Sequence, residues 1–105
     1  MFMSNPGNVP DMTLDTVRAE ISEVDSRIIR LIAQRQKLAG KIAQIKVAHS
    51  IPIHDGDRAA DVLESAFEQA VECRIDPVSV QKIFEILIAM SEERQRECSG
   101  DGNLP

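Results

Sequence analysis

A long run of apolar residues, spaced alternately by three and four positions, constrains this chain more than any other feature. Its members are Leu14, Val17, Ile21, Val24, Ile28, Leu31, Leu38, Ile42 and Ile45. This spacing places the apolar residues on one face of an amphipathic α-helix. It predicts one continuous helix from about Leu14 to about His49, with Asp11 or Thr13 as its capping residue.

Such a helix is too long to bury its apolar face within one compact chain. At about 1.5 Å per residue it would extend roughly 54 Å, whereas a folded domain of about 100 residues has a radius of gyration of about 13 Å. Shorter helices of the same chain could cover only part of the face. A sustained repeat of this kind is typical of helices that pair with other helices. We therefore predict a homodimer built on the long helix.

The rest of the chain predicts two shorter helices. Pro52 interrupts the first helical pattern, because proline cannot continue a helix and biases the residue before it toward extended geometry. A second helix is expected from Asp55 or Asp57 to about Cys73. A third is expected to begin at Asp76-Pro77, where an Asp cap precedes a proline in the first helical position.

No strand pattern occurs, so the predicted fold class is all-α with one long and two shorter helices per chain. The third helix is expected to end near Cys98. Clusters of Pro, Gly and Asn near both ends of the sequence indicate irregular segments. The predicted organisation is a flexible lead-in at residues 1–13, a helical domain at 14–98 and a disordered tail at 99–105.

Composition excludes several kinds of partner. The net charge of -5 and the aromatic content of 3% argue against nucleic-acid binding, which favours basic surfaces and stacking side chains. No apolar segment is long enough to span a membrane. Cys73 and Cys98 lack metal-ligand spacing, and we interpret them as free thiols of a cytoplasmic protein.

Arg35 occupies the one position of the apolar series that lacks an apolar residue. A permanent cation in a buried helix face is costly unless an anion meets it. Either a carboxylate of the protein pairs with Arg35, or an anionic ligand does. Lys46 lies about three turns further along and points the same way, so both side chains could converge on one small ligand. Arg18 lies roughly 25 Å before Arg35 and could share that site only from the partner of an antiparallel dimer.

Further polar residues could complete such a site. Asp55 and Arg58 follow the break at Pro52, and Ser91 and Gln95 share a face of the third helix. No nucleophile–base pair, phosphate-binding loop or metal motif occurs, so an enzyme of this kind would use neither covalent catalysis, a metal nor a cofactor. If these charges are instead solvated, the chain is a non-catalytic helical dimerisation module.

The order of these residues resembles the all-helical chorismate mutase family from about Leu14 to Gln95. The similarity is carried by V-R-x-x-I-x-x-V-D near the start of the long helix and A-x-R-x-x-L-A-x-x-I-A-x-x-K in its second half. It continues through the loop I-P-I-x-D-x-x-R and the IFEILIAMSEERQ segment of the third helix. Each motif alone is weak, but their order and spacing together are fairly specific.

The resemblance implies an intertwined antiparallel homodimer that converts chorismate to prephenate in phenylalanine and tyrosine synthesis. It implies that Arg18 reaches one substrate carboxylate from the other subunit, and that Arg35 binds the second. Lys46 and Gln95 would contact the ether oxygen from two sides, which makes Arg35, Lys46 and Gln95 the expected catalytic residues. The resemblance adds Asp55, Arg58 and Ser91 as further substrate-binding residues.

Ala59 departs from the family pattern, since many members have a glutamate there that hydrogen-bonds the ring hydroxyl of chorismate. An alanine cannot form that bond, although Asp55 or the Asp55-Gly56 backbone could substitute. The loss keeps a related activity open, that of isochorismate-pyruvate lyase, which forms salicylate. The retained Asp55 and the IPIHDGDR loop favour the mutase.

Overall fold

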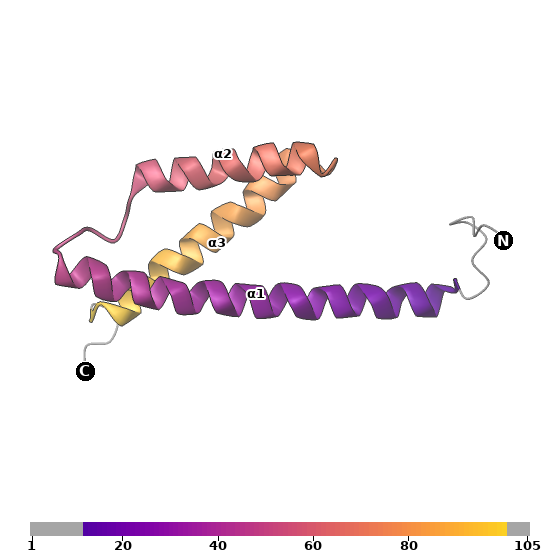
Figure 1. Cartoon of the computed structure of the whole chain (residues 1–105), viewed down its shortest axis with the longest axis horizontal. Coiled ribbons are helices and arrows are strands. Elements are labelled where there is room, and N and C mark those ends of the chain that lie inside the picture. Colours follow the sequence, from indigo (N-terminus) through magenta and orange to yellow (C-terminus); the bar gives the residue numbers. More distant parts are fainter. Residues whose placement is uncertain (1–11, 101–105) are drawn as a thin grey trace, which may run out of the picture. The chain divides into compact units, whose positions relative to one another are not determined.

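The computed structural model describes residues 12–100, which form three α-helices and no strand (Figure 1). The helices are α1 (Leu14–Ala48), α2 (Gly56–Glu72) and α3 (Pro77–Cys98). The all-α, three-helix prediction is confirmed, and each helix boundary lies close to its predicted position. None of the described helices combines the length and apolarity that a membrane span requires. Most of the predicted lead-in and tail lies outside the described residues.

Thr13 is the capping residue of α1. The backbone N–H of Thr16 donates to Thr13 Oγ1 at 3.1 Å, and the N–H of Thr13 donates to Thr16 Oγ1 at 2.9 Å. This reciprocal pair satisfies two amide groups that have no partner within the helix. Asp11, the alternative cap, lies outside the described residues.

The two shorter helices begin at aspartates, as the sequence predicts. Asp55 Oδ1 accepts a hydrogen bond from the backbone N–H of Arg58 at 3.0 Å. Asp76 Oδ2 accepts from the N–H of Ser79 at 3.2 Å, and Pro77 follows it in the first turn. These caps fix where α2 and α3 start.

Both α1 and α2 end at a residue in the left-handed region. Ser50 has φ 56° and Arg74 has φ 59°. In each case the next residue donates back into the last turn, Ile51 to the Lys46 carbonyl at 2.8 Å and Ile75 to the Ala70 carbonyl at 3.0 Å. These bonds close the helix ends and turn the chain sharply.

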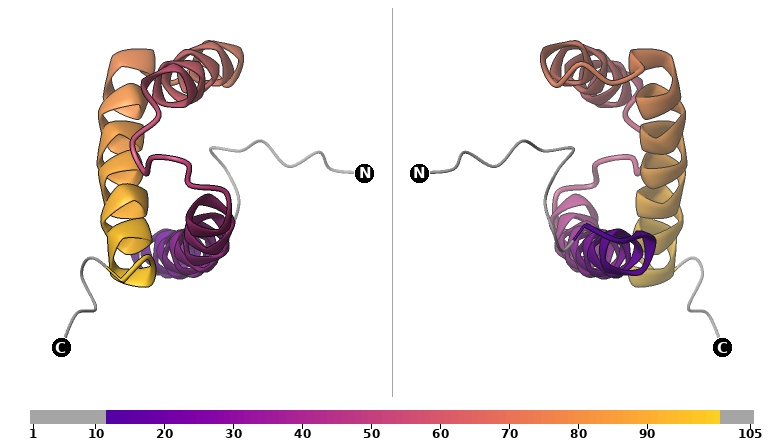
Figure 2. Two further views of the ribbon diagram at one scale, coloured as in Figure 1. Left: turned by 90° about the vertical axis from the view of Figure 1, so that its left-hand side faces the viewer. Right: turned by 90° about the vertical axis from the view of Figure 1, so that its right-hand side faces the viewer.

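The chain divides into two units, Met1–Ala33 and Gln34–Pro105, and the boundary falls inside α1. Within the second unit α2 packs on α3, and the C-terminal end of α3 lies beside the last turns of α1 (Figure 2). Gly40 lies at this approach, where a Cβ would be in van der Waals contact with Cys98 Sγ at 3.4 Å. The site described below lies entirely in this unit.

The buried core of the described chain is small and made of alanines. Ala39, Ala43, Ala66 and Ala70 are its buried apolar residues, and no large side chain is fully buried. Large apolar side chains lie exposed on every helix, including several that the sequence places on inward faces. The exposed members of the α1 series are Leu14, Ile21, Val24, Ile28, Leu31, Leu38, Ile42 and Ile45. A single chain therefore leaves most of its apolar repeat uncovered.

Candidate functional site

One cavity of about 310 Å³ brings together all the site residues selected from the sequence except Arg18. It is formed by the second half of α1, the loop before α2, the first turns of α2 and the second half of α3. Its polar lining comprises Arg35, Lys46, Asp55, Arg58, Ser91, Glu92 and Gln95, and its apolar lining Leu38, Ala39, Ile42, Ile53, Ala59, Val62 and Ile88. Polar groups of fixed position on a largely apolar wall are typical of small-molecule sites.

Arg18 does not line this cavity. It belongs to the other unit of the chain, and its side chain is exposed. That Arg18 reaches the site from a partner subunit stays a prediction.

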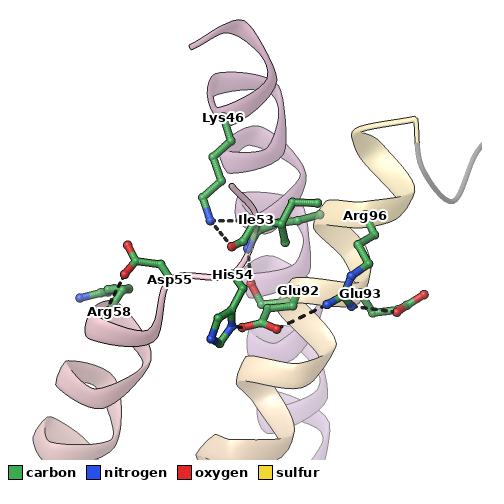
Figure 3. A network of polar contacts seen from close by, with 10 residues as sticks. Lys46, Ile53, His54, Asp55, Arg58, Glu92, Glu93 and Arg96 are labelled. Atoms are coloured by element: carbon green, nitrogen blue, oxygen red, sulfur yellow. Dashed lines mark hydrogen bonds and ion pairs between the residues drawn. The ribbon is translucent and has the colours of Figure 1, made fainter. Parts of the chain in front are cut away.

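Lys46 is held by two hydrogen bonds that aim its ammonium into the cavity (Figure 3). Its Nζ donates to the carbonyl oxygen of Ile53 at 2.6 Å and to Gln95 Oε1 at 2.9 Å. An ammonium group carries three protons, so one donor remains for a ligand. The two fixed acceptors position that donor before any ligand binds.

Gln95 is the one buried polar residue of the described chain, with 5% of its surface exposed. Its Oε1 accepts from Lys46, and its Nε2 donates to Ser91 Oγ at 3.1 Å. These contacts fix the orientation of the amide, with the carbonyl toward the ammonium and the NH₂ group toward Ser91. The second proton of that NH₂ group is available to a ligand oxygen.

Arg35 is half-buried, and its Nη1 donates to the Leu87 carbonyl at 3.0 Å. Burial, and then the neighbouring Arg58 guanidinium, lower the pKa of Arg35 below its usual range. Both causes disfavour the charged form. Within residues 12–100 neither arginine forms an ion pair with a carboxylate, and neither does Lys46. The sequence allows Arg35 to pair either with a carboxylate of the protein or with an anionic ligand. The described chain provides no such carboxylate.

The two acidic residues of the cavity are already engaged. Asp55 caps α2. Glu92 Oε2 lies 2.9 Å from His54 Nδ1, and its Oε1 lies 3.7 Å from Arg96 Nη2 (Figure 3). Because both carboxylates have donors of their own, the lining retains free cationic groups for an anion.

Sequence reasoning missed Ile53, Glu92 and the role of His54. Ile53 acts through its backbone carbonyl, which no side-chain pattern reports. Glu92 is adjacent to Ser91 on the same helix, so its position could have been inferred. His54 is exposed, but it meets a carboxylate from a distant part of the sequence. That contact depends on how the loop folds onto α3.

The described residues hold no group of three or more His, Cys, Asp or Glu side chains arranged to bind a metal ion. Cys73 and Cys98 are free thiols. Ala59 lines the cavity on the first turn of α2, so a longer side chain there would project toward the ligand. Apart from the two engaged carboxylates, the polar groups of the lining are donors and cations, and their arrangement suits the binding of a small anion.

Residues 17–96 match the family model of chorismate mutase type II. The chain is 34% identical over 84 residues to a chorismate mutase of Methanocaldococcus jannaschii, covering 80% of this chain and 85% of that protein. It is 33% identical over 79 residues to a bifunctional chorismate mutase/prephenate dehydratase of Enterobacter agglomerans, covering 75% of this chain and 20% of that protein. A bifunctional protein of Escherichia coli is 28% identical over 72 residues, or 69% of this chain and 19% of its own length.

Proposed function

The chain belongs to the chorismate mutase type II family, and we propose on that basis that it rearranges chorismate to prephenate in the cavity lined by Arg35, Lys46 and Gln95. The match spans most of the chain and of the archaeal relative, but only about a fifth of the bifunctional relatives. The comparisons do not favour a lyase or a non-catalytic module.

The proposed reaction makes limited demands on the protein. A Claisen rearrangement breaks a C–O bond and forms a C–C bond within one molecule, so it requires no acid, base or nucleophile. The protein has to hold the dianion in its folded, reactive conformer. It also has to place positive charge where the ether oxygen gains electron density in the transition state.

The observation that carries the proposal is the fixed donor pair of Lys46 and Gln95. Two protein acceptors orient the ammonium, and Ser91 orients the amide. Each group has one proton left, and both line the same cavity. Donors that are oriented beforehand stabilise developing charge without reorganising during the reaction.

Arg35 and Arg58 are the proposed partners of substrate carboxylates. Their like charges face each other across the cavity wall and disfavour one another, as the lowered pKa of Arg35 reflects. A carboxylate bound between them would relieve that repulsion, and a planar guanidinium can bind it through two parallel hydrogen bonds.

We further propose an intertwined antiparallel homodimer in which the partner supplies Arg18. A second cavity, of about 440 Å³, is lined by Arg35, Arg58 and apolar side chains of α2 and α3 such as Val80 and Phe84. The exposed apolar face of the first half of α1 has the length and character to fill it. A partner helix seated there would bring its Arg18 next to Arg35.

We also propose that the protein is cytoplasmic. The free thiols of Cys73 and Cys98 support this location, because disulfides are rare there. The reaction, as proposed, uses no cofactor or metal ion, so a chelator should leave turnover unchanged.

The decisive test is to assay one preparation with two substrates. The proposal expects prephenate from chorismate at a higher kcat/KM than salicylate from isochorismate. The opposite order would make the chain a lyase. No turnover of either substrate by folded, dimeric protein would leave it a non-catalytic module.

A further inference from the structure

Glu92 is an unexpected lining residue for a cavity that takes an anion. Its side chain is only 19% exposed. On α3 it directly follows Ser91 and precedes Gln95 by three residues, and all three line the cavity. A carboxylate in this position repels a dianion unless its charge is balanced. Arg96, at 3.7 Å, balances part of this charge, and His54, at 2.9 Å, adds to the balance when its imidazole is protonated.

His54 differs from Arg96 because its charge depends on pH. Its side chain is 68% exposed and open to proton exchange with solvent. Histidine is the side chain whose charge changes most readily within the physiological pH range. Arg96 stays charged throughout that range, and it also binds Glu93 at 3.3 Å. Of the two partners of Glu92, His54 is therefore the one whose charge can change with pH.

His54 also lies next to the carbonyl that holds Lys46. Ile53 accepts the hydrogen bond from Lys46 Nζ, and the following residue is tied to α3 through Glu92 (Figure 3). The contact fixes the loop at the point where its backbone meets the ammonium. Loss of the contact would loosen the Ile53 carbonyl, one of the two acceptors that hold Lys46.

We infer that His54 is a positioning residue whose protonation, acting through Glu92, sets how tightly the cavity holds its dianionic substrate; this rests on the proposed function. With His54 protonated, Glu92 is balanced and the substrate binds well. When His54 loses its proton, the lining becomes more negative and KM rises. The charged groups around His54 are Glu92 and Arg96 on α3, Lys46 on α1, and Asp55 and Arg58 at the start of α2.

The test compares KM for chorismate between about pH 5.5 and 7.5, a range in which carboxylates stay ionised and an imidazole titrates. The wild type should show KM rising about two- to fivefold with pH, the effect of one unit charge near a partly screened site. His54→Asn places an amide nitrogen where Nδ1 stands and keeps the hydrogen bond to Glu92 without titrating. Its KM should be constant and close to the high-pH value of the wild type.

The chain offers a matched control, since His49 is its other histidine and does not line the cavity. His49→Asn should keep the wild-type profile. Glu92→Gln should have a lower KM than the wild type at the high-pH end, because it removes the unbalanced carboxylate. The kcat of His54→Asn should match the wild type, whereas His54→Ala should lower kcat because it also frees the loop.

Outcomes separate this inference from the proposed function. Turnover of chorismate with the same pH profile in the wild type and His54→Asn would overturn the inference and leave the function standing. Equal kcat in the wild type and His54→Ala would overturn the positioning role. An absence of turnover in the wild type would overturn the proposed function and this inference with it.

Discussion

The two halves of α1 share one apolar repeat but differ in what their own chain offers them. In the second half, Ala39 and Ala43 are 1% and 0% exposed, and Arg35 and Lys46 line the cavity. In the first half, Ile21, Ile28 and Leu31 are 55%, 49% and 64% exposed. The repeat itself is exposed in both halves, since Leu38 and Ile42 are still 48% and 42% exposed. Only in the second half does it stand beside buried alanines and line a cavity.

The difference shows that the repeat determines which side of α1 is apolar. The helices that pack beside α1 determine how that side is used. The second half meets α3 closely at Gly40 and carries the cations of the site. The first half, by our proposal, covers the second cavity of a partner chain.

Ile28→Asp should cause the largest loss. The substitution places a charge in the apolar face of the first half of α1, where a proposed partner helix would bury it. We expect both the dimer and nearly all activity to disappear, as measured by sedimentation velocity and by chorismate turnover. Ala19→Asp, on the opposite face of the same helix, should preserve both. A fully active monomer of Ile28→Asp would contradict the proposed dimer.

Lys46→Ala tests the second half of α1. Removing one preorganised donor should lower kcat on the order of a hundredfold or more. Lys41→Ala removes an ammonium from the same helix outside the cavity and should leave kcat within about twofold, as expected for an exposed surface residue. Equal kcat in the two variants would remove Lys46 from the mechanism.

Mixing the Arg18→Ala and Arg35→Ala proteins tests whether the first half of α1 in one subunit and the second half in the other contribute to one site. Each variant alone should be nearly inactive. After random exchange of subunits, half of the dimers would be mixed, and each would hold one intact site of two. Recovery of about a quarter of wild-type turnover is therefore expected for a symmetric dimer with shared sites. Confirmed exchange without recovery would place Arg18 outside the site.

Ala59→Glu tests how the cavity recognises the ring hydroxyl of chorismate. The glutamate found in many family members would hydrogen-bond the ring hydroxyl of chorismate, and one such bond corresponds to about two- to tenfold in kcat/KM. The gain should be specific to chorismate. An equal change for isochorismate, or a loss for chorismate, would show that the added charge outweighs the new bond.

The smallest effect is expected at Asp76, away from both halves of α1. Hydrogen bonds from the Ser79 side chain and backbone lower the pKa of Asp76 below its ordinary value of 3.8. The ionised cap therefore stabilises the fold above that value, and the contribution is lost as pH falls through the lowered folded-state pKa. Asp76→Ala should have a lower Tm than the wild type at neutral pH. The difference should narrow in acid, while activity at neutral pH stays unchanged.

Much of the fold could be predicted from local signals. The three-and-four spacing predicted α1, Pro52 predicted its interruption, and the Asp76-Pro77 pair predicted the start of α3. These signals work because they depend on neighbours along the chain. The burial of individual side chains was less accessible. Ile83 on α3 is 55% exposed, because the described chain has too few helices to cover every apolar face.

Local sequence patterns were sufficient to predict the helices, their caps, Arg35 as a cation within the apolar face, and Lys46 as a second cation that points the same way. The tertiary structure decided which groups meet them: the Ile53 carbonyl and Gln95 at Lys46, and the Leu87 carbonyl and Arg58 at Arg35. It also decided that His54 meets the carboxylate of Glu92 in the cavity wall. The physical reason is that helix formation depends on residues three and four positions apart, whereas hydrogen bonds between distant segments depend on how the loop and α3 return to α1.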